Sequence, residues 1–321
     1  MTDQPKIKRF FSNPYVTLSM GILCLSFSPL FTHWADAPGI VTSFYRMLIS
    51  VIVLLPFVGK IFHHANVRTT VDANHTKSRL GWQHILIPIL AGAFSGVDHA
   101  LWGTALKETS VANATLLNYI SPLWVSLVAI FILKEKYKVT YWVGLVLVLS
   151  GSISVLNILN TDLTFNFRGE GFAMISSFFY AGYFLLTQKG RTFYTTLQQL
   201  FISLLSCCLT LGLIILLTQL PVVGYSQTTY LIFLLSALLS QLLGYFSLTH
   251  SLGKIPASIV SPSLSLQPVI TALLAIPFAN QALATYQIIG GFLVLVGILT
   301  INKSEIKENG LVSPGIEPLA N

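Results

Sequence analysis

The amino-acid sequence predicts an all-helical integral membrane protein with ten transmembrane helices, arranged as two inverted repeats of five helices. Three observations lead to this prediction. The chain of 321 residues is 54% hydrophobic and only 9% charged, with a mean hydropathy of +0.74, whereas soluble domains carry about 25% charged residues. Apolar stretches long enough to cross a hydrocarbon layer of ~30 Å recur along it. The two halves also share a pattern at a constant offset of 146 residues.

Ten apolar stretches have the length of a membrane-spanning helix. They cover residues 14–32, 38–59, 85–106, 111–133, 141–159, 171–188, 196–218, 230–250, 256–279 and 283–301. The N-terminal segment carries three basic residues but no evident cleavage site, so we expect no cleaved signal. The three cysteines lie inside these stretches without metal-ligand spacing, which predicts neither a disulfide framework nor a metal site.

The basic residues predict the orientation of the chain. If the N-terminus is cytoplasmic, all but three of the 18 lysines and arginines lie on the inner side. Lys107 and Arg168 fall in outer loops, and Arg46 lies within a span. The positive-inside rule then places both termini in the cytoplasm. The net charge of +7 therefore reports topology, and no compact basic patch with interleaved aromatic residues indicates nucleic-acid binding.

An internal repeat divides the chain. Residues 144–151 (GLVLVLSG) resemble residues 290–297 (GGFLVLVG), and the same offset carries Pro122 onto Pro268 without a gap. We expect a cytoplasmic segment 1–13, a first repeat 14–159, an external linker 160–170, a second repeat 171–301 and a cytoplasmic tail 302–321. Because five spans are an odd number, the second repeat is inverted, an arrangement that transporters use to alternate access. A duplication retained only for folding is the alternative.

Prolines and glycines occupy matching positions in the two repeats. Pro122 and Pro268 lie near the middle of the fourth and ninth spans, where each removes a backbone donor and bends its helix, either beside a central site or as a static kink. The glycine pairs 144/151 and 290/297 are each seven residues apart and share a helix face. We expect them to allow close packing of the fifth and tenth spans.

Three segments resemble a known family. They are FYRMLIS in the second span, DHALWGTALKETSVANATLLNYISPLWVSLVAIFILKEK across the third and fourth, and SLTHSLGKIPASIVSPSLSLQPVITALLAIPFANQ as their counterpart. In these segments the chain is similar to the EamA branch of the drug/metabolite transporter superfamily. The resemblance implies ten helices, cytoplasmic termini, a central cavity between the halves, and transport of small metabolites such as amino acids or export of toxic compounds. Gln281 departs from the pattern, which often has glutamate there.

An arginine and a carboxylate lie deep inside the predicted spans. Arg46 is eight residues after Pro38 and Asp98 is eight residues before Leu106, so both are roughly 12 Å below the outer face. We expect them to face a central cavity and interact there, with His99 beside them. The pair is either a fixed structural ion pair or part of the substrate path. In the second case Arg46 attracts an anionic group, and Asp98 a cationic group or a coupling proton.

Further polar residues complete the predicted substrate site. The amides of Gln241 and Gln267 lie at mid-span, where each needs a partner helix, a water or a ligand. Tyr180 and Tyr183 share a helix face and could stack on a substrate or belong to the core. Asn118 lies nearer the outer end of the fourth span.

Three classes of function compete. A secondary transporter explains the repeat, the paired prolines and the buried polar residues together. A membrane-embedded enzyme needs a clustered catalytic set, which only Asp98 and His99 approach, and a scaffold needs no buried charge. We therefore predict a non-enzymatic transporter without cofactor, in a bacterial inner membrane, whose partners are a small-molecule substrate, a coupling proton or counter-solute, and membrane lipid. The sequence leaves open whether it forms a homodimer.

The predicted topology can be tested by cysteine labelling. After Cys24, Cys207 and Cys208 are replaced with serine or alanine, single cysteines are placed at His64 in one variant and Thr161 in another. An impermeant thiol reagent added to intact cells is expected to label only the Thr161 variant, because only the linker 160–170 is external in this topology. Labelling of both positions from the same side would contradict two inverted repeats of five spans.

Overall fold

The computed structural model describes residues 13–63, 82–109, 111–132, 134–156, 167–279 and 284–306, and its regular structure there is entirely helical. This confirms the predicted all-helical class. Several sequence predictions lie outside the described residues. They concern the N-terminal segment before residue 13, the labelling positions His64 and Thr161, most of the linker 160–170 and the tail from 307 onward.

Each of the first five predicted spans is formed by one or more helices. Their helices are α2 (Pro14–Leu25) and α3 (Ser28–Trp34); α4 (Gly39–Leu54), a 3₁₀ turn (Leu55–Phe57) and α5 (Val58–His63); α6 (Trp82–Glu108); α7 (Val111–Asn118) and α8 (Ser121–Phe131); and α9 (Val139–Val155).

In the second half the first two spans are single helices and the third is divided, whereas the fourth is divided and the fifth single, as in the first half. Its helices are α10 (Phe167–Gly190); α11 (Thr196–Thr218); α12 (Gln227–Ser236), the π-helical stretch η3 (Ala237–Tyr245) and α13 (Phe246–Leu252); α14 (Ala257–Ser263) and α15 (Leu266–Ala279); and α16 (Thr285–Ile306).

Eight helical segments of the described chain are long and apolar enough to cross a membrane. The two other predicted spans correspond to α9 and α10. Helix α9 has 17 residues and is apolar but slightly short. Helix α10 has 24 residues, yet its serines, glycines and tyrosines make it more polar than the eight. That polarity is informative, because α10 contributes several buried hydroxyl groups to the interior of the bundle.

Matching breaks divide the fourth span of each half. Helix α7 ends at Asn118 and α8 begins at Ser121, with Pro122 in its first turn. Helix α14 ends at Ser263 and α15 begins at Leu266, so Pro268 also lies in a first turn. A proline in a first turn gives up a backbone donor that has no intrahelical partner in any case. The sequence led us to expect bent helices, whereas the structure has two separate helices in each span.

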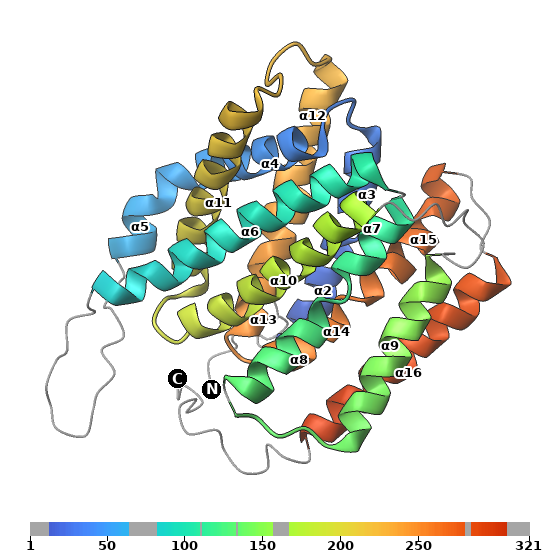
Figure 1. The fold of residues 1–321 in the computed structure, drawn as a ribbon. Coiled ribbons are helices and arrows are strands. Elements are labelled where there is room, and N and C mark those ends of the chain that lie inside the picture. The colour runs from blue at the N-terminus through green and yellow to red at the C-terminus, as the bar shows by residue number, and fades with distance from the viewer. Residues whose placement is uncertain are drawn as a thin grey trace, which may run out of the picture.

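The helices pack as a pseudo-two-fold arrangement (Figure 1). The third span of each half packs against the first and second spans of the other half: α6 against α10 and α11, and the α12–η3–α13 span against α2 and α4. Spans of equal rank also meet, because α4 contacts α11, α8 contacts α14 and α9 contacts α16. Such reciprocal contacts are what two structurally equivalent halves produce when a two-fold axis relates them.

Helices α9 and α16 form a pair at one edge of the bundle (Figure 1). A Cβ atom on Gly144 would lie 2.8 Å from the carbonyl oxygen of Gly297, and one on Gly151 would lie 2.6 Å from that of Gly290. Backbone therefore meets backbone at both places, as the glycine spacing led us to expect. Side chains join the two helices as well, because Ser154 donates a hydrogen bond of 2.8 Å to the carbonyl oxygen of Tyr286.

The glycine contact predicts a selective loss of stability. Gly151→Ala is expected to cost about 1–3 kcal/mol, because the new methyl group meets backbone atoms that cannot move aside. Gly171→Ala is the control, since nothing lies within 4 Å of a Cβ atom at that glycine. Thermal unfolding of the detergent-solubilised variants, followed by tryptophan fluorescence, measures the difference. Equal midpoints for the two variants would disprove the close packing of α9 on α16.

Candidate functional site

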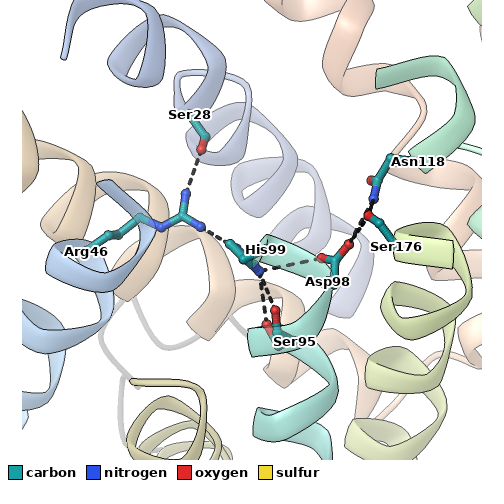
Figure 2. A network of polar contacts seen from close by, with 7 residues as sticks. All are labelled: Ser28, Arg46, Ser95, Asp98, His99, Asn118 and Ser176. Carbon is teal, nitrogen blue, oxygen red and sulfur yellow. Dashed lines mark hydrogen bonds and ion pairs between the residues drawn. The ribbon is translucent and has the colours of Figure 1, made fainter. Parts of the chain in front are cut away.

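A chain of polar side chains crosses the interior of the bundle. Figure 2 shows it running from α3 through α4 and α6 to α7 and α10. It contains the predicted Arg46, Asp98, His99 and Asn118, together with three serines that the sequence analysis did not single out. The side chains of Arg46, Asp98 and His99 are all buried, with exposed fractions of 6%, 5% and 6%.

Two hydrogen bonds partly compensate the cost of burying the cationic side chain of Arg46. Its Nη1 donates to the Ser28 hydroxyl at 2.7 Å, and its Nη2 donates to Nε2 of His99. Its Nε is buried and has no hydrogen-bond partner in the described part of the chain. The guanidinium group therefore still has a free donor inside the bundle. A cation at such depth is costly unless it is paired, so it needs a nearby negative charge.

His99 lies between Arg46 and the carboxylate. Its Nδ1 is 2.7 Å from the carbonyl oxygen of Ser95, one turn earlier on α6, and 3.5 Å from Oδ2 of Asp98. Arginine can only donate hydrogen bonds, so Nε2 of the imidazole must be the acceptor and Nδ1 must carry the proton. The ring in this arrangement is neutral, and it contacts the guanidinium group with one nitrogen and the carboxylate with the other.

Asp98 is held from its other side by two neutral donors. Its Oδ1 accepts hydrogen bonds from the Ser176 hydroxyl at 2.6 Å and from Nδ2 of Asn118 at 2.9 Å. Nδ2 of Asn118 also donates to the Ser176 oxygen at 2.7 Å. Asn118 is the last residue of α7 and precedes the break in the fourth span. Ser176 belongs to α10, so the carboxylate is bonded across the boundary between the two halves.

Helix geometry explains why neighbouring residues face different partners. Asp98 and His99 are consecutive on α6, so their side chains point about 100° apart around its axis. His99 faces α4, and Asp98 faces α7 and α10 (Figure 2). Among the described residues no ion pair joins Arg46 directly to Asp98. The predicted interaction between these two charges is therefore indirect, because His99 contacts both of them.

Aromatic residues lie close to this chain of polar groups. Tyr180 and Tyr183 are buried on one face of α10, with ring planes 5° apart and centroids 6.5 Å apart. The ring of Tyr183 meets that of Tyr245 on η3 at 5.9 Å. Tyr245 also lies within electrostatic range of both Arg46 and Asp98. The two predicted tyrosines thus lie beside the charged residues, together with a third tyrosine, Tyr245, from η3.

The two predicted glutamines are not hydrogen-bonded to the charged residues within the described part of the chain. Gln241 is in η3, is 3% exposed and has an Oε1 atom without a hydrogen-bond partner in the described part. Gln267 is buried in the first turn of α15. No hydrogen bond given by the described residues connects either amide to Arg46, His99 or Asp98.

The site also contains four residues that were not predicted from the sequence: Ser28, Ser95, Ser176 and Tyr245. A serine in a membrane helix commonly bonds to its own preceding turn, so these residues carry no signal of their own. The repeat offset does carry one. The positions 146 residues after Ser95 and His99 are Gln241 and Tyr245, which the structure also buries. Within the described residues, no group of three or more His, Cys, Asp and Glu side chains could hold a metal ion.

Charge balance in the buried network predicts a non-additive loss of stability. Arg46→Gln and Asp98→Asn each leave one uncompensated buried charge and are expected to lower the free energy of unfolding by about 3–5 kcal/mol. The double variant leaves none, so it is expected to lose less than the sum of the two single losses. Thermal or denaturant unfolding of the three solubilised variants measures the coupling. Additive losses would show that the two charges do not sense each other through His99.

Comparison with known proteins agrees with this architecture. The model of the EamA-like transporter family matches residues 14–157 and again residues 167–303. The "Uncharacterized inner membrane transporter YhbE" of Escherichia coli K12 is 26% identical over 230 residues, which cover 68% of this chain and 70% of that protein. The proteins of the same name from E. coli O157:H7 and Shigella flexneri match to the same extent.

A solved structure supports the fold independently. A structure titled "Crystal structure of protein" superposes with a TM-score of 0.72 over 91% of this chain and 98% of its own, at 16% sequence identity. At that identity the match concerns the fold alone. The two family matches together cover most of the chain, one in each half. The chain belongs to the EamA-like transporter family and is a polytopic membrane transporter.

Proposed function

We propose that this transporter moves a small metabolite, an amino acid or a related compound, or a toxic compound, by alternating access between its two halves. The observation that carries the proposal is the buried chain of polar groups from Ser28 to Ser176. It contains a guanidinium group and a carboxyl group in an interior where a charge is costly. A protein that only had to fold could avoid that cost with apolar side chains.

The asymmetry of the network favours a functional role over a structural one. The positions 146 residues after Asp98 and His99 are Gly244 and Tyr245, neither of which is charged at neutral pH. Both repeats form the same pattern of helix contacts, yet only the first carries the charges. The helix packing common to both halves therefore does not need them.

The location of the network suits alternating access. Asp98 in the first half accepts a hydrogen bond from Ser176 in the second half, so a relative movement of the halves changes the surroundings of the carboxylate. In our proposal Arg46, His99, Asp98 and Asn118 lie on the substrate path together with Tyr180 and Tyr183. Gln241 and Gln267 line it further along, and the helix breaks before Pro122 and Pro268 border it.

We also propose that both termini are cytoplasmic and that the chain lies in a bacterial inner membrane. The distribution of lysines and arginines supports the orientation. The name of the E. coli relative, an inner membrane transporter, supports the location. The divisions of the chain at residues 14, 159, 171 and 301 remain part of this proposal and lie close to the limits of the two family matches.

Transport in proteoliposomes tests the function. Purified protein is reconstituted, and uptake of a mixture of radiolabelled amino acids is measured with and without unlabelled solute trapped inside. Arg46→Gln and Asp98→Asn are expected to reduce uptake about tenfold or more, because each removes hydrogen bonds to a charged group worth about 1.5–3 kcal/mol. Lys107→Gln and Asp36→Asn are the matched controls, since they remove the same charges at exposed positions.

Two results would count against the proposal. If folded Arg46→Gln and Asp98→Asn proteins transport normally, the buried charges are a fixed structural pair. If the reconstituted wild type neither accumulates nor exchanges any labelled amino acid, and a thermal-shift screen with nucleosides and organic cations shows no stabilisation, a small polar metabolite is the wrong substrate class. A ligand that binds the folded form raises its apparent stability by mass action, so the screen needs no labelled compound.

A further inference from the structure

The position of His99 poses a question that transport by itself does not answer. Its ring nitrogens are both engaged, Nε2 by Arg46 and Nδ1 by the carbonyl oxygen of Ser95. An imidazole with a protonated Nδ1 can accept one more proton, and only at Nε2. That nitrogen is the one that the guanidinium group occupies. A proton and Arg46 therefore compete for a single lone pair.

The groups around His99 determine how readily its ring takes up a proton. The charged neighbours among the described residues are Arg46 on α4 and Asp98 on α6. Other elements contribute titratable groups to the same buried region: Tyr119 between α7 and α8, Tyr180 on α10, Cys207 on α11 and Tyr245 on η3. Phenols and thiols are ordinarily neutral near pH 7. Burial of the ring and the charge of Arg46 both oppose a positive charge on it, whereas the Ser95 carbonyl oxygen and the carboxylate of Asp98 favour one.

The summed charge of Arg46, Asp98 and His99 limits which ions can bind among these three residues. With Arg46 positive, Asp98 negative and His99 neutral, the sum is zero. An anionic group that bound Arg46 alone would make the sum negative, and a proton on His99 alone would make it positive. Each single event places an uncompensated charge in an apolar interior. The two events together restore a sum of zero.

We propose that Nε2 of His99 is the binding site of a coupling proton, which it takes up when an anionic group of the substrate draws Arg46 away from it. This inference rests on the proposed transport function and names its coupling ion. The substrate class that it selects is a small carboxylate with one net negative charge, such as an acidic amino acid. The free Nε donor of Arg46 provides a further hydrogen bond for such a carboxylate. Substrate and proton then cross together.

Nuclear magnetic resonance of the full-length protein tests the competition without any substrate. Protein labelled with ¹⁵N and ¹³C in histidine is studied in nanodiscs between pH 5.5 and 8.5, and the His99→Gln spectrum identifies the His99 signals. In the wild type we expect a neutral ring at pH 7 with the proton on Nδ1. In Arg46→Gln we expect His99 to take up its proton at a pH at least about one unit higher than in the wild type, because a neighbouring positive charge is gone.

Two outcomes would overturn the proposal. One is a wild-type ring at pH 7 that is doubly protonated or carries its proton on Nε2, a result that needs no variant to fold. The other is the same titration of His99 in the wild type and in folded Arg46→Gln. His84→Gln, near the start of the same helix, is the control for general effects of losing a histidine.

Proton flux separates this proposal from the function on which it rests. Proteoliposomes containing a pH-sensitive dye are given radiolabelled L-glutamate, and protons moved per glutamate are counted. We expect about one for the wild type and His84→Gln, and a ratio close to zero for any residual uptake by His99→Gln. An unchanged ratio in His99→Gln refutes the proton site. Wild-type uptake of neutral amino acids but not of glutamate leaves the transport function standing and refutes the anionic substrate class and with it the coupling.

Discussion

The packing of the interior depends on one constraint: a buried guanidinium group and a buried carboxylate must each have polar partners. Arg46 and Asp98 do not touch, yet His99 and three serines give almost every polar atom around them a partner. The helices that supply these partners come from both halves, so the packing of α6 against α4 and α10 is also the means by which the charges are compensated. Any substitution that moves one of these helices changes the electrostatic surroundings of both charges.

The broken spans have a definite part in that arrangement. Asn118 donates to Asp98 from the final turn of α7, just before the chain turns and restarts at Ser121. A continuous helix would carry its polar backbone groups in internal bonds, whereas a break leaves some of them, and the adjacent side chains, free for other contacts. The corresponding break after Ser263 lies in a buried stretch rich in serine, where the hydroxyls of Ser261 and Ser265 have no partner in the described part of the chain.

Much of this could be predicted from the sequence, for physical reasons. Span length and hydropathy follow from the thickness of the bilayer. The repeat follows from the constant offset of 146 residues, and the paired glycines of its two copies meet crosswise, Gly144 against Gly297 and Gly151 against Gly290. Depth along a helix placed Arg46 and Asp98 at one level. Rotation about the helix axis was not predictable, because it depends on neighbours that the sequence does not name. That is why His99 intervenes unexpectedly and why Ser176, an ordinary serine by its sequence context, proved to be a partner of the carboxylate.

The uneven distribution of charge between the halves has an energetic consequence. In a transporter whose two repeats were identical, the outward-facing and inward-facing conformations would be mirror images in energy and equally populated at rest. Here Gly244 and Tyr245 stand where the first repeat has Asp98 and His99. In the alternating-access cycle that we propose, opening toward one side would hydrate the ionic groups to a different degree than opening toward the other, and the two conformations would then differ in free energy. In that cycle we expect the empty carrier to rest on a preferred side of the membrane and to bind its substrate with unequal affinity from the two sides.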